Sequence, residues 1–264
     1  MRQNPLTSII MKFLSILITL LLLCSGATAT TKKRPCNPLT GDAVQQQAKD
    51  LNRFKNRSQP PSLFDFDPTV TIQKILAPGN DANPRFPMTK AATITGYVVK
   101  VQKGGIETCN CHATNPAKMD THIDIVADPK YAVPRFVKMT CHGKTIQKDT
   151  KEKYYMIVEV TPRVRGQQRA KGVDWSSVTL KKQLTHHWVR FSGWLLFDDQ
   201  HVREAENTNP GNKCNWRATC TEIHPIFGIK VVNPPSRFAN ARNSIKARRL
   251  RLSLKHAVAD DSSG

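Results

Sequence analysis

The chain has 264 residues, with 40 lysines and arginines against 20 aspartates and glutamates and a formal net charge of +20. This length suits one domain with extensions, and the absence of an internal repeat argues against repeat architectures. The charge raises the local concentration of polyanions such as nucleic acid, anionic lipid or acidic polysaccharide, but it does not choose among them.

A secretory signal stands near the start of the chain. Residues 11–29 combine a basic start at Lys12, an apolar stretch and an Ala-Thr-Ala motif typical of a cleavage site. The apolar stretch is short for a membrane-spanning helix. We therefore expect residues 1–29 to be removed, with Met1 or Met11 as the true start, and an exported protein that is periplasmic, secreted or at the cell surface. The alternative is a lipid anchor at Cys24, although a leucine before this cysteine is unfavourable for lipoprotein processing.

The mature chain keeps an even number of cysteines, which in an oxidising compartment favours disulfides. Cys109 and Cys111 are too close together to pair readily, so we expect one of them to bond to Cys141. Cys214 and Cys220 are expected to close the loop before the last strand. The alternative is a zinc site built from thiolates and imidazoles. Its candidate ligands are Cys109, Cys111, His112, Cys141 and His142. These spacings do not match the common zinc modules, so we predict no metal and no cofactor.

Residues 30–90 are predicted to form an N-terminal extension of helical and loop segments. A helix is expected over residues 42–54, because Val44, Leu51 and Phe54 lie on one stripe at helical spacing. A short strand-like run follows at 70–76, and a loop rich in proline, glycine and asparagine leads into the main domain.

Residues 91–232 carry the element order β-β-β-α-β-β. The strands are expected at 92–101, 121–127, 154–160, 188–197 and 216–223, with a short helix ending near 184. Gly96 and Gly193 inside strands suit the bends of a barrel, and Pro225 is expected to end the fifth strand. The order predicts an all-β fold, an OB-like five-stranded barrel whose open face often binds single-stranded nucleic acid or sugar.

Four segments carry a resemblance: GYVVKVQKGGIETCNC, THIDIV, MIVEVTPR and WRATCTEIHPI. Together they resemble uncharacterised exported bacterial proteins with an OB-fold-like domain, over about residues 52–232. Such relatives often have a tryptophan where this chain has Thr221, beside Glu222. The resemblance implies fold and export and leaves function open.

Binding of a polyanion is the favoured function, with nucleic acid slightly ahead of anionic envelope components, and we expect a binding module rather than an enzyme. Proteins that bind single strands combine a basic groove with rings that stack on bases. The predicted binding residues are Arg163, Arg165, Arg169, Lys171, Lys181, Lys182, Tyr155 and Trp194.

A metal-dependent, phosphodiesterase-like hydrolase is the first alternative. His122 and Asp124 are two residues apart on one strand, as are Glu222 and His224, so each pair shares a face. With Glu159, these side chains would bind a divalent cation or perform acid–base chemistry, provided that they converge. Polar residues also alternate on any half-exposed sheet, which is the simpler explanation. The second alternative is a structural or adhesive envelope protein.

Residues 233–264 are predicted to form a basic tail. The stretch 237–255 holds seven lysines and arginines and no acid. Helical and strand-like spacings disagree within it, so we expect disorder until a partner is met. Such a tail suits an anionic membrane surface or a phosphate backbone.

Overall fold

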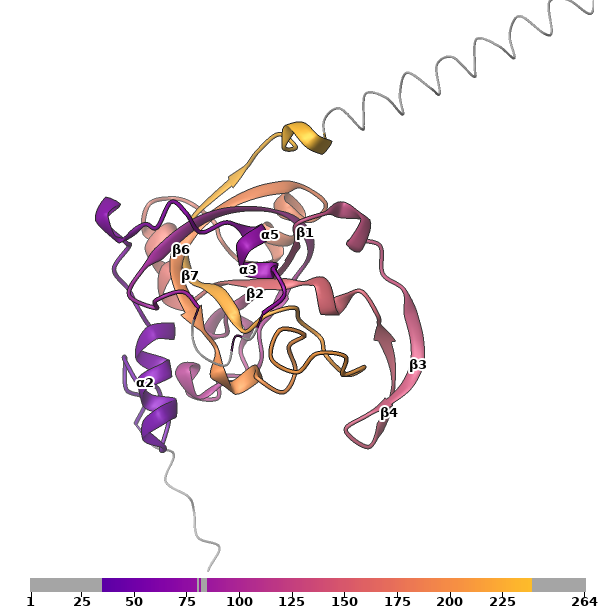
Figure 1. Cartoon of the computed structure of the whole chain (residues 1–264). Helices are drawn as coiled ribbons and strands as arrows, with labels where there is room; N and C mark the ends of the chain where they lie inside the picture. The colour runs from indigo at the N-terminus through magenta and orange to yellow at the C-terminus, as the bar shows by residue number, and fades with distance from the viewer. Residues whose placement is uncertain (1–34, 80, 82–84, 239–264) are drawn as a thin grey trace, which may run out of the picture. The chain divides into compact units, whose positions relative to one another are not determined.

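The computed structural model describes residues 35–79, 81 and 85–238. Five strands close into a barrel in the order β1-β2-β5-β7-β6 (Figure 1). Their bounds are β1 Ala91–Lys103, β2 Thr121–Val126, β5 Met156–Val160, β6 Trp188–Phe197 and β7 Thr221–Val231. Only the pair β5–β7 is parallel among these barrel neighbours. The all-β, OB-like prediction is therefore confirmed.

The barrel interior is apolar because the strands alternate. Ile123 and Ile125 of β2 and Val158 of β5 point inward and are fully buried, so His122 and Glu159 on the same strands face outward. Four α-helices surround the strands within the described ranges: α2 Gln46–Lys55, α3 Ile72–Leu76, α4 Pro162–Ala170 and α5 Ser177–Leu184. Helices α3 and α5 both add apolar side chains to the core.

Short 3₁₀ turns connect these elements. They are η1 Leu63–Asp65, η2 Thr108–Asn110, η3 Pro116–Lys118, η4 Pro129–Tyr131, η5 Glu152–Tyr154 and η6 Asp199–His201. Among the residues that the structure describes, none of the helices combines the length and apolarity needed to cross a membrane. The predicted signal at 1–29, including Cys24, and the tail beyond residue 238 lie outside the described residues.

The strand-like run at 70–76 is a wrong prediction, since α3 occupies it. The Thr71 hydroxyl accepts a hydrogen bond from the Lys74 amide and caps the helix. Ile72 and Ile75 are three residues apart, and both are buried in the core. The helical spacing thus outweighed the β-branched composition.

Strand β7 also differs from the prediction at both ends. Trp216 lies in the preceding loop, and the strand runs from Thr221 through Pro225 to Val231. The missing proline amide is tolerated because the β6–β7 register shifts around Gly193. A Cβ at Gly193 would lie 2.3 Å from the carbonyl oxygen of Pro225, so only glycine fits beside this irregularity.

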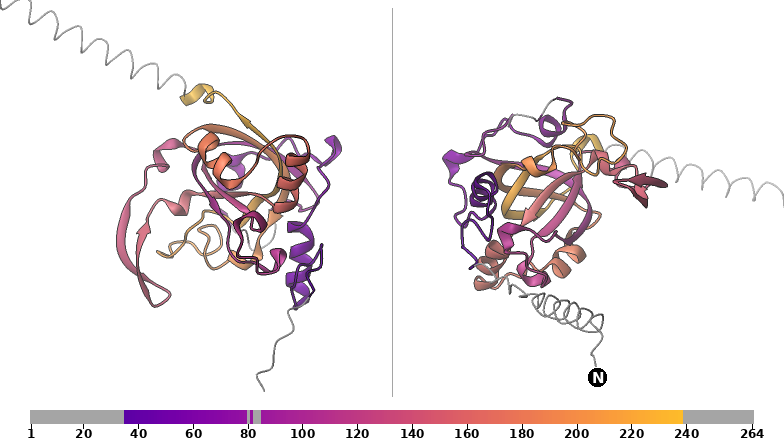
Figure 2. Two further views of the ribbon diagram at one scale, coloured as in Figure 1. Left: turned by 180° about the vertical axis from the view of Figure 1, so that it is seen from behind. Right: turned by 90° about the horizontal axis from the view of Figure 1, so that it is seen from below.

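A two-stranded hairpin, β3 Phe136–Cys141 and β4 Lys144–Asp149, is inserted between β2 and β5. It stands to the side of the barrel in opposite views (Figures 1 and 2). No sequence prediction anticipated it. The disulfide Cys141–Cys214 joins this hairpin to the β6–β7 loop.

The disulfide pairing corrects the sequence prediction. Cys111 bonds to Cys36, and Cys141 bonds to Cys214. Cys109 and Cys220 are buried with free thiols. Cys111 adopts a left-handed backbone with φ of 54°, which separates the directions of the two neighbouring cysteines. The two disulfides indicate an oxidising environment.

Candidate active site

A cluster of charged side chains lies on the outer face of β2, β5 and β7. It is covered by α2, by the β1–β2 loop (104–120) and by the β6–β7 loop (198–220). In OB barrels, the second and third strands and these two loops form the usual ligand face. A cavity of about 560 Å³ lies between the loops. Its lining includes Gly105, Glu107, His122, Glu159, His201, Trp216 and Arg217.

Glu159 lies between two histidines. Its partner across the β2–β5 register is His122, whose Nε2 is 3.5 Å from Glu159 Oε1. Strands β5 and β7 run parallel with Val158 beside Ile223, which brings His224 alongside Glu159. His224 Nδ1 is 3.3 Å from Glu159 Oε2. The topology of the barrel therefore unites side chains that are far apart in the sequence.

A second carboxylate orients His224. Arg217 Nη2 donates to Glu222 Oε1 at 2.5 Å, and Glu222 Oε2 is 3.3 Å from His224 Nδ1. Burial raises the pKa of Glu222, but Arg217 and His224 outweigh it and hold that pKa well below its usual value. Charged Glu222 therefore favours a proton on His224 Nδ1, so that Nε2 is free to bind another group.

Helix α2 brings a cation into the cluster. Lys55 Nζ is 2.8 Å from Glu107 Oε2 and 2.8 Å from Asp198 Oδ2. Burial lowers the pKa of Lys55, but Asp198 and Glu107 outweigh it and raise that pKa well above its usual value. Lys55 therefore stays charged and neutralises part of the negative charge of the cluster.

Two acids of the cluster, Asp120 and Glu159, form no ion pair with a lysine or arginine among the described residues. Burial raises the pKa of both Asp120 and Glu159, and neighbouring carboxylates add to the effect. Within the described part of the chain, Asp120 Oδ1, Glu159 Oε2 and His224 Nε2 have no hydrogen-bond partner. Buried polar atoms are rarely left unpaired in native proteins. This end of the cluster thus holds two carboxyl groups that resist losing their protons, together with unpaired oxygen and nitrogen atoms that a cation could bind.

These three residues are also spaced as metal ligands. One ligand atom from each of Asp120, Glu159 and His224 lies within 4.8 Å of the others, and all three residues are buried. Two carboxylates and an imidazole suit a divalent cation such as Mn²⁺ or Zn²⁺. The hydrogen bond between Glu222 and His224 matches the carboxylate–histidine support that is usual behind metal-binding imidazoles.

His122 faces the cavity beside this triad. Its side chain is 14% exposed, and its ring meets the Trp216 ring edge-on with centroids 5.9 Å apart. Burial lowers the pKa of His122 to about 4. Its Nε2 has no hydrogen-bond partner among residues 35–79, 81 and 85–238. The ring is therefore neutral, and its Nε2 can accept a hydrogen bond from a molecule in the cavity.

Four of the five predicted catalytic residues lie in the cluster: His122, Glu159, Glu222 and His224. Asp124 shares the outer face of β2 but makes no ion pair or hydrogen bond with described residues. Burial raises the pKa of Asp124 to about 7.

The predicted binding residues do not form one surface. Arg165 is buried and donates to the Met119 carbonyl and the Thr121 hydroxyl. Tyr155 is buried with its hydroxyl on Asp149, and Arg163 donates to Asn56 and to the Pro38 carbonyl. Trp194 Nε1 donates to the Gln59 carbonyl, and its ring lies under Arg57. The exposed members lie on α4, α5 and their connection: Arg169, Lys171, Lys181 and Lys182.

The zinc alternative is wrong. Cys111 and Cys141 are in disulfides with different partners, so neither offers a thiolate. His112 Nδ1 instead lies 2.7 Å from Asp42 Oδ2. Cys109 lies next to the acid cluster, with Sγ 3.3 Å from Glu107 Oε2, and burial raises the pKa of its thiol.

Sequence reasoning missed Lys55, Glu107, Asp120 and Arg217. All four come from covering segments rather than from alternating strand positions. A usable signal was present for two of them: Asp120 directly precedes β2, and Arg217 lies five residues before Glu222.

Comparisons with protein families, with curated proteins and with solved structures find no match for this chain. Fold and site together define an OB-like barrel with a buried acid–histidine cluster on the outer face of β2, β5 and β7.

Proposed function

We propose that this protein is an exported, metal-dependent hydrolase that cleaves a phosphodiester or similar bond in a polyanion. The observation that carries the proposal is the convergence of Asp120, Glu159 and His224, with unpaired ligand atoms, beside the cavity that His122 lines. The hydrolase hypothesis required its strand residues to converge, and four of the five do.

Each group has a chemical role in this proposal. Asp120, Glu159 and His224 would hold a divalent cation, which polarises a phosphoryl oxygen and makes bound water more acidic. His122 Nε2 accepts a hydrogen bond from the attacking water and orients it. Arg217 lines the same cavity with an unpaired Nη1 and donates to an anionic oxygen of the substrate. The strongly positive net charge of the chain, which stays high without Arg2 and Lys12 of the expected signal, raises the local concentration of polyanions.

Export belongs to the same proposal. The two disulfides fit an oxidising compartment, and residues 11–29 have the composition of a secretory signal. The substrate is therefore expected to be a polymer that is encountered outside the cytoplasm.

The test is hydrolysis of bis(4-nitrophenyl) phosphate by the oxidised protein. We expect release of 4-nitrophenol with Mn²⁺, and loss of release in EDTA. Removing a group that only supports a metal ligand typically costs about 10–100-fold, so Glu159→Gln, which removes a ligand, should lower the rate by about 100-fold or more. Glu152→Gln is the matched control, because Glu152 pairs with Lys148 outside the cluster. No metal-stimulated turnover, or equal loss in both variants, would overturn the proposal.

A further inference from the structure

We propose, on the basis of the hydrolase function above, that the substrate is single-stranded nucleic acid and that the β3–β4 hairpin and a pocket at its base bind it. The pocket has a volume of about 790 Å³ and lies between η4, η5 and the β6–β7 loop. Neither the pocket nor the hairpin contains any of the binding residues that the sequence predicted.

The pocket and the cavity beside the acid cluster share the β6–β7 loop as a wall, because Asn207 and Ala218 line the pocket and Trp216 and Arg217 line the cavity. In the antiparallel pair β2–β5, the cluster residues His122 and Glu159 are at one end, whereas Ala127 and Tyr154 line the pocket at the other. Five residues of strand separate His122 from Ala127, which corresponds to about 17 Å. A single strand seated in the pocket would therefore reach the cluster within a few nucleotides.

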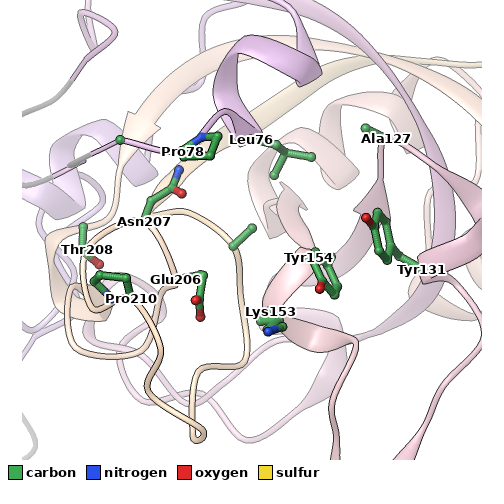
Figure 3. A pocket seen from close by; sticks show the side chains of 12 residues that line it. Leu76, Pro78, Ala127, Tyr131, Lys153, Tyr154, Glu206, Asn207, Thr208 and Pro210 are labelled. Carbon is green, nitrogen blue, oxygen red and sulfur yellow. The ribbon is translucent and has the colours of Figure 1, made fainter.

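The lining of the pocket suits a flat heterocyclic ring. Tyr131 and Tyr154 stack with ring centroids 4.0 Å apart and an angle of 18° between the planes. They form one side of the pocket, and residues of the β6–β7 loop, including Pro210, face them from the other (Figure 3). Most of the remaining lining is apolar, with Leu76, Pro78 and Ala218 among its residues. Aromatic walls of this kind bind unstacked bases in proteins that recognise single strands.

Two lysines lie beside the stacked rings, whereas the opposite wall carries Glu206, whose oxygens accept hydrogen bonds from the Gly211 amide and the Asn215 side chain. Lys130 Nζ is 4.8 Å from the centroid of the Tyr131 ring, and Lys153 Nζ is 5.4 Å from that of Tyr154. Cations beside stacking rings would bind the phosphates on either side of a seated base.

The hairpin extends this positive surface. Residues 128–153 contain seven lysines and arginines, two of which are the lysines beside the stacked rings, and three acids. Each acid is engaged locally: Asp128 with Lys130, Glu152 with Lys148, and Asp149 with the Tyr155 hydroxyl. Five basic residues have no ion pair with any described residue: Arg135, Lys138, Lys144, Lys151 and Lys153. Single-stranded nucleic acid is the polyanion that offers both phosphates to bind these cations and bases to stack on the rings of the pocket.

The hairpin also offers exposed apolar side chains. Phe136 is 62% exposed and Ile146 is 39% exposed. Phe136 and Lys138 alternate with less exposed residues along β3, so a ring and a cation lie on one side of the strand. A folded duplex hides its bases from both the ring and the pocket, so the arrangement favours single strands.

The experiment measures binding of a fluorescent 12-nucleotide single strand to the full oxidised chain in EDTA, where no turnover occurs. Tyr154→Leu and Ala218→Trp, which fills the pocket, should each weaken binding about tenfold. Lys138→Glu with Lys144→Glu should lower the magnitude of the slope of log affinity against log salt by about 0.7 for each phosphate that the variant no longer neutralises, the value for single strands. Lys181→Glu with Lys182→Glu on α5 is the charge-matched control and should weaken binding less than the double variant in the hairpin does.

Two outcomes overturn the inference. One is the absence of single-strand binding at low salt. The other is equal binding of duplex DNA or heparin together with unchanged affinity in the pocket variants. Hydrolysis of bis(4-nitrophenyl) phosphate separates this failure from failure of the proposed function, because that small substrate does not need the hairpin. Turnover without oligonucleotide binding rejects the inference alone, and binding without turnover rejects the hydrolase.

Discussion

Replacing Asp124 by asparagine should change how stability depends on pH. Burial raises the pKa of Asp124 from 3.8 to about 7 in the folded protein. Between these values the folded protein holds a proton that the unfolded chain has released, so this carboxyl makes the fold less stable as pH rises from about 4 to about 7. A difference of about 3 in pKa corresponds to about 4 kcal/mol.

The Asp124→Asn variant lacks this pH-dependent loss of stability, because asparagine does not titrate. Its free energy of unfolding, relative to that of the unchanged protein, should increase by about 4 kcal/mol between pH 4 and pH 8 and then stay level. Urea unfolding at one-unit pH intervals measures the difference. Asp50→Asn is the control, because the Asp50 side chain is 55% exposed. Parallel stability curves for the Asp124 variant and the unchanged protein would refute the reasoning.

Three further predictions concern close contacts, buried charge and the proposed cation. Gly193→Ala should cost about 1–3 kcal/mol by overpacking against Pro225, whereas Gly166→Ala, with no atom within 4 Å of its new Cβ, should gain up to about 1 kcal/mol in α4; thermal unfolding compares them. Arg217→Met should cost about 3–5 kcal/mol because Glu222 is left buried without its cation, and adding Glu222→Gln should recover part of this loss in urea unfolding; no recovery would contradict the account. Mn²⁺ at about 100 times its dissociation constant should stabilise the protein by about 2.7 kcal/mol, and Asp120→Asn should remove this shift in calorimetry.

The barrel could be predicted because its information is local. Alternation in β2 and β5 and the two strand glycines were visible in single segments. The hairpin was missed because its strands are largely exposed, so they lack the apolar alternation that marks a half-buried strand. The end of β7 was predicted wrongly at Pro225, because only a partner glycine in another strand makes room for the irregularity.

The candidate site was predictable only in its strand residues. The spacing of Glu222 and His224 gave their shared face, but the pairing of β5 with β7 decided that they meet Glu159. Lys55 reaches the cluster from a helix 52 residues before Glu107, and no local pattern encodes such a contact. Residues contributed by covering loops and helices depend on the tertiary structure.

The Cys141–Cys214 bond closes a covalent ring that contains β4, β5, both following helices and β6. A protease that cuts once anywhere within this ring, for example at the exposed turn around Gly143, leaves both fragments attached. The cut chain would keep its mass on a non-reducing gel and separate into two pieces only after reduction. The turn of the hairpin and the exposed part of β4 can thus be cut without separating the two fragments, whereas a cut in β3 before Cys141 separates them.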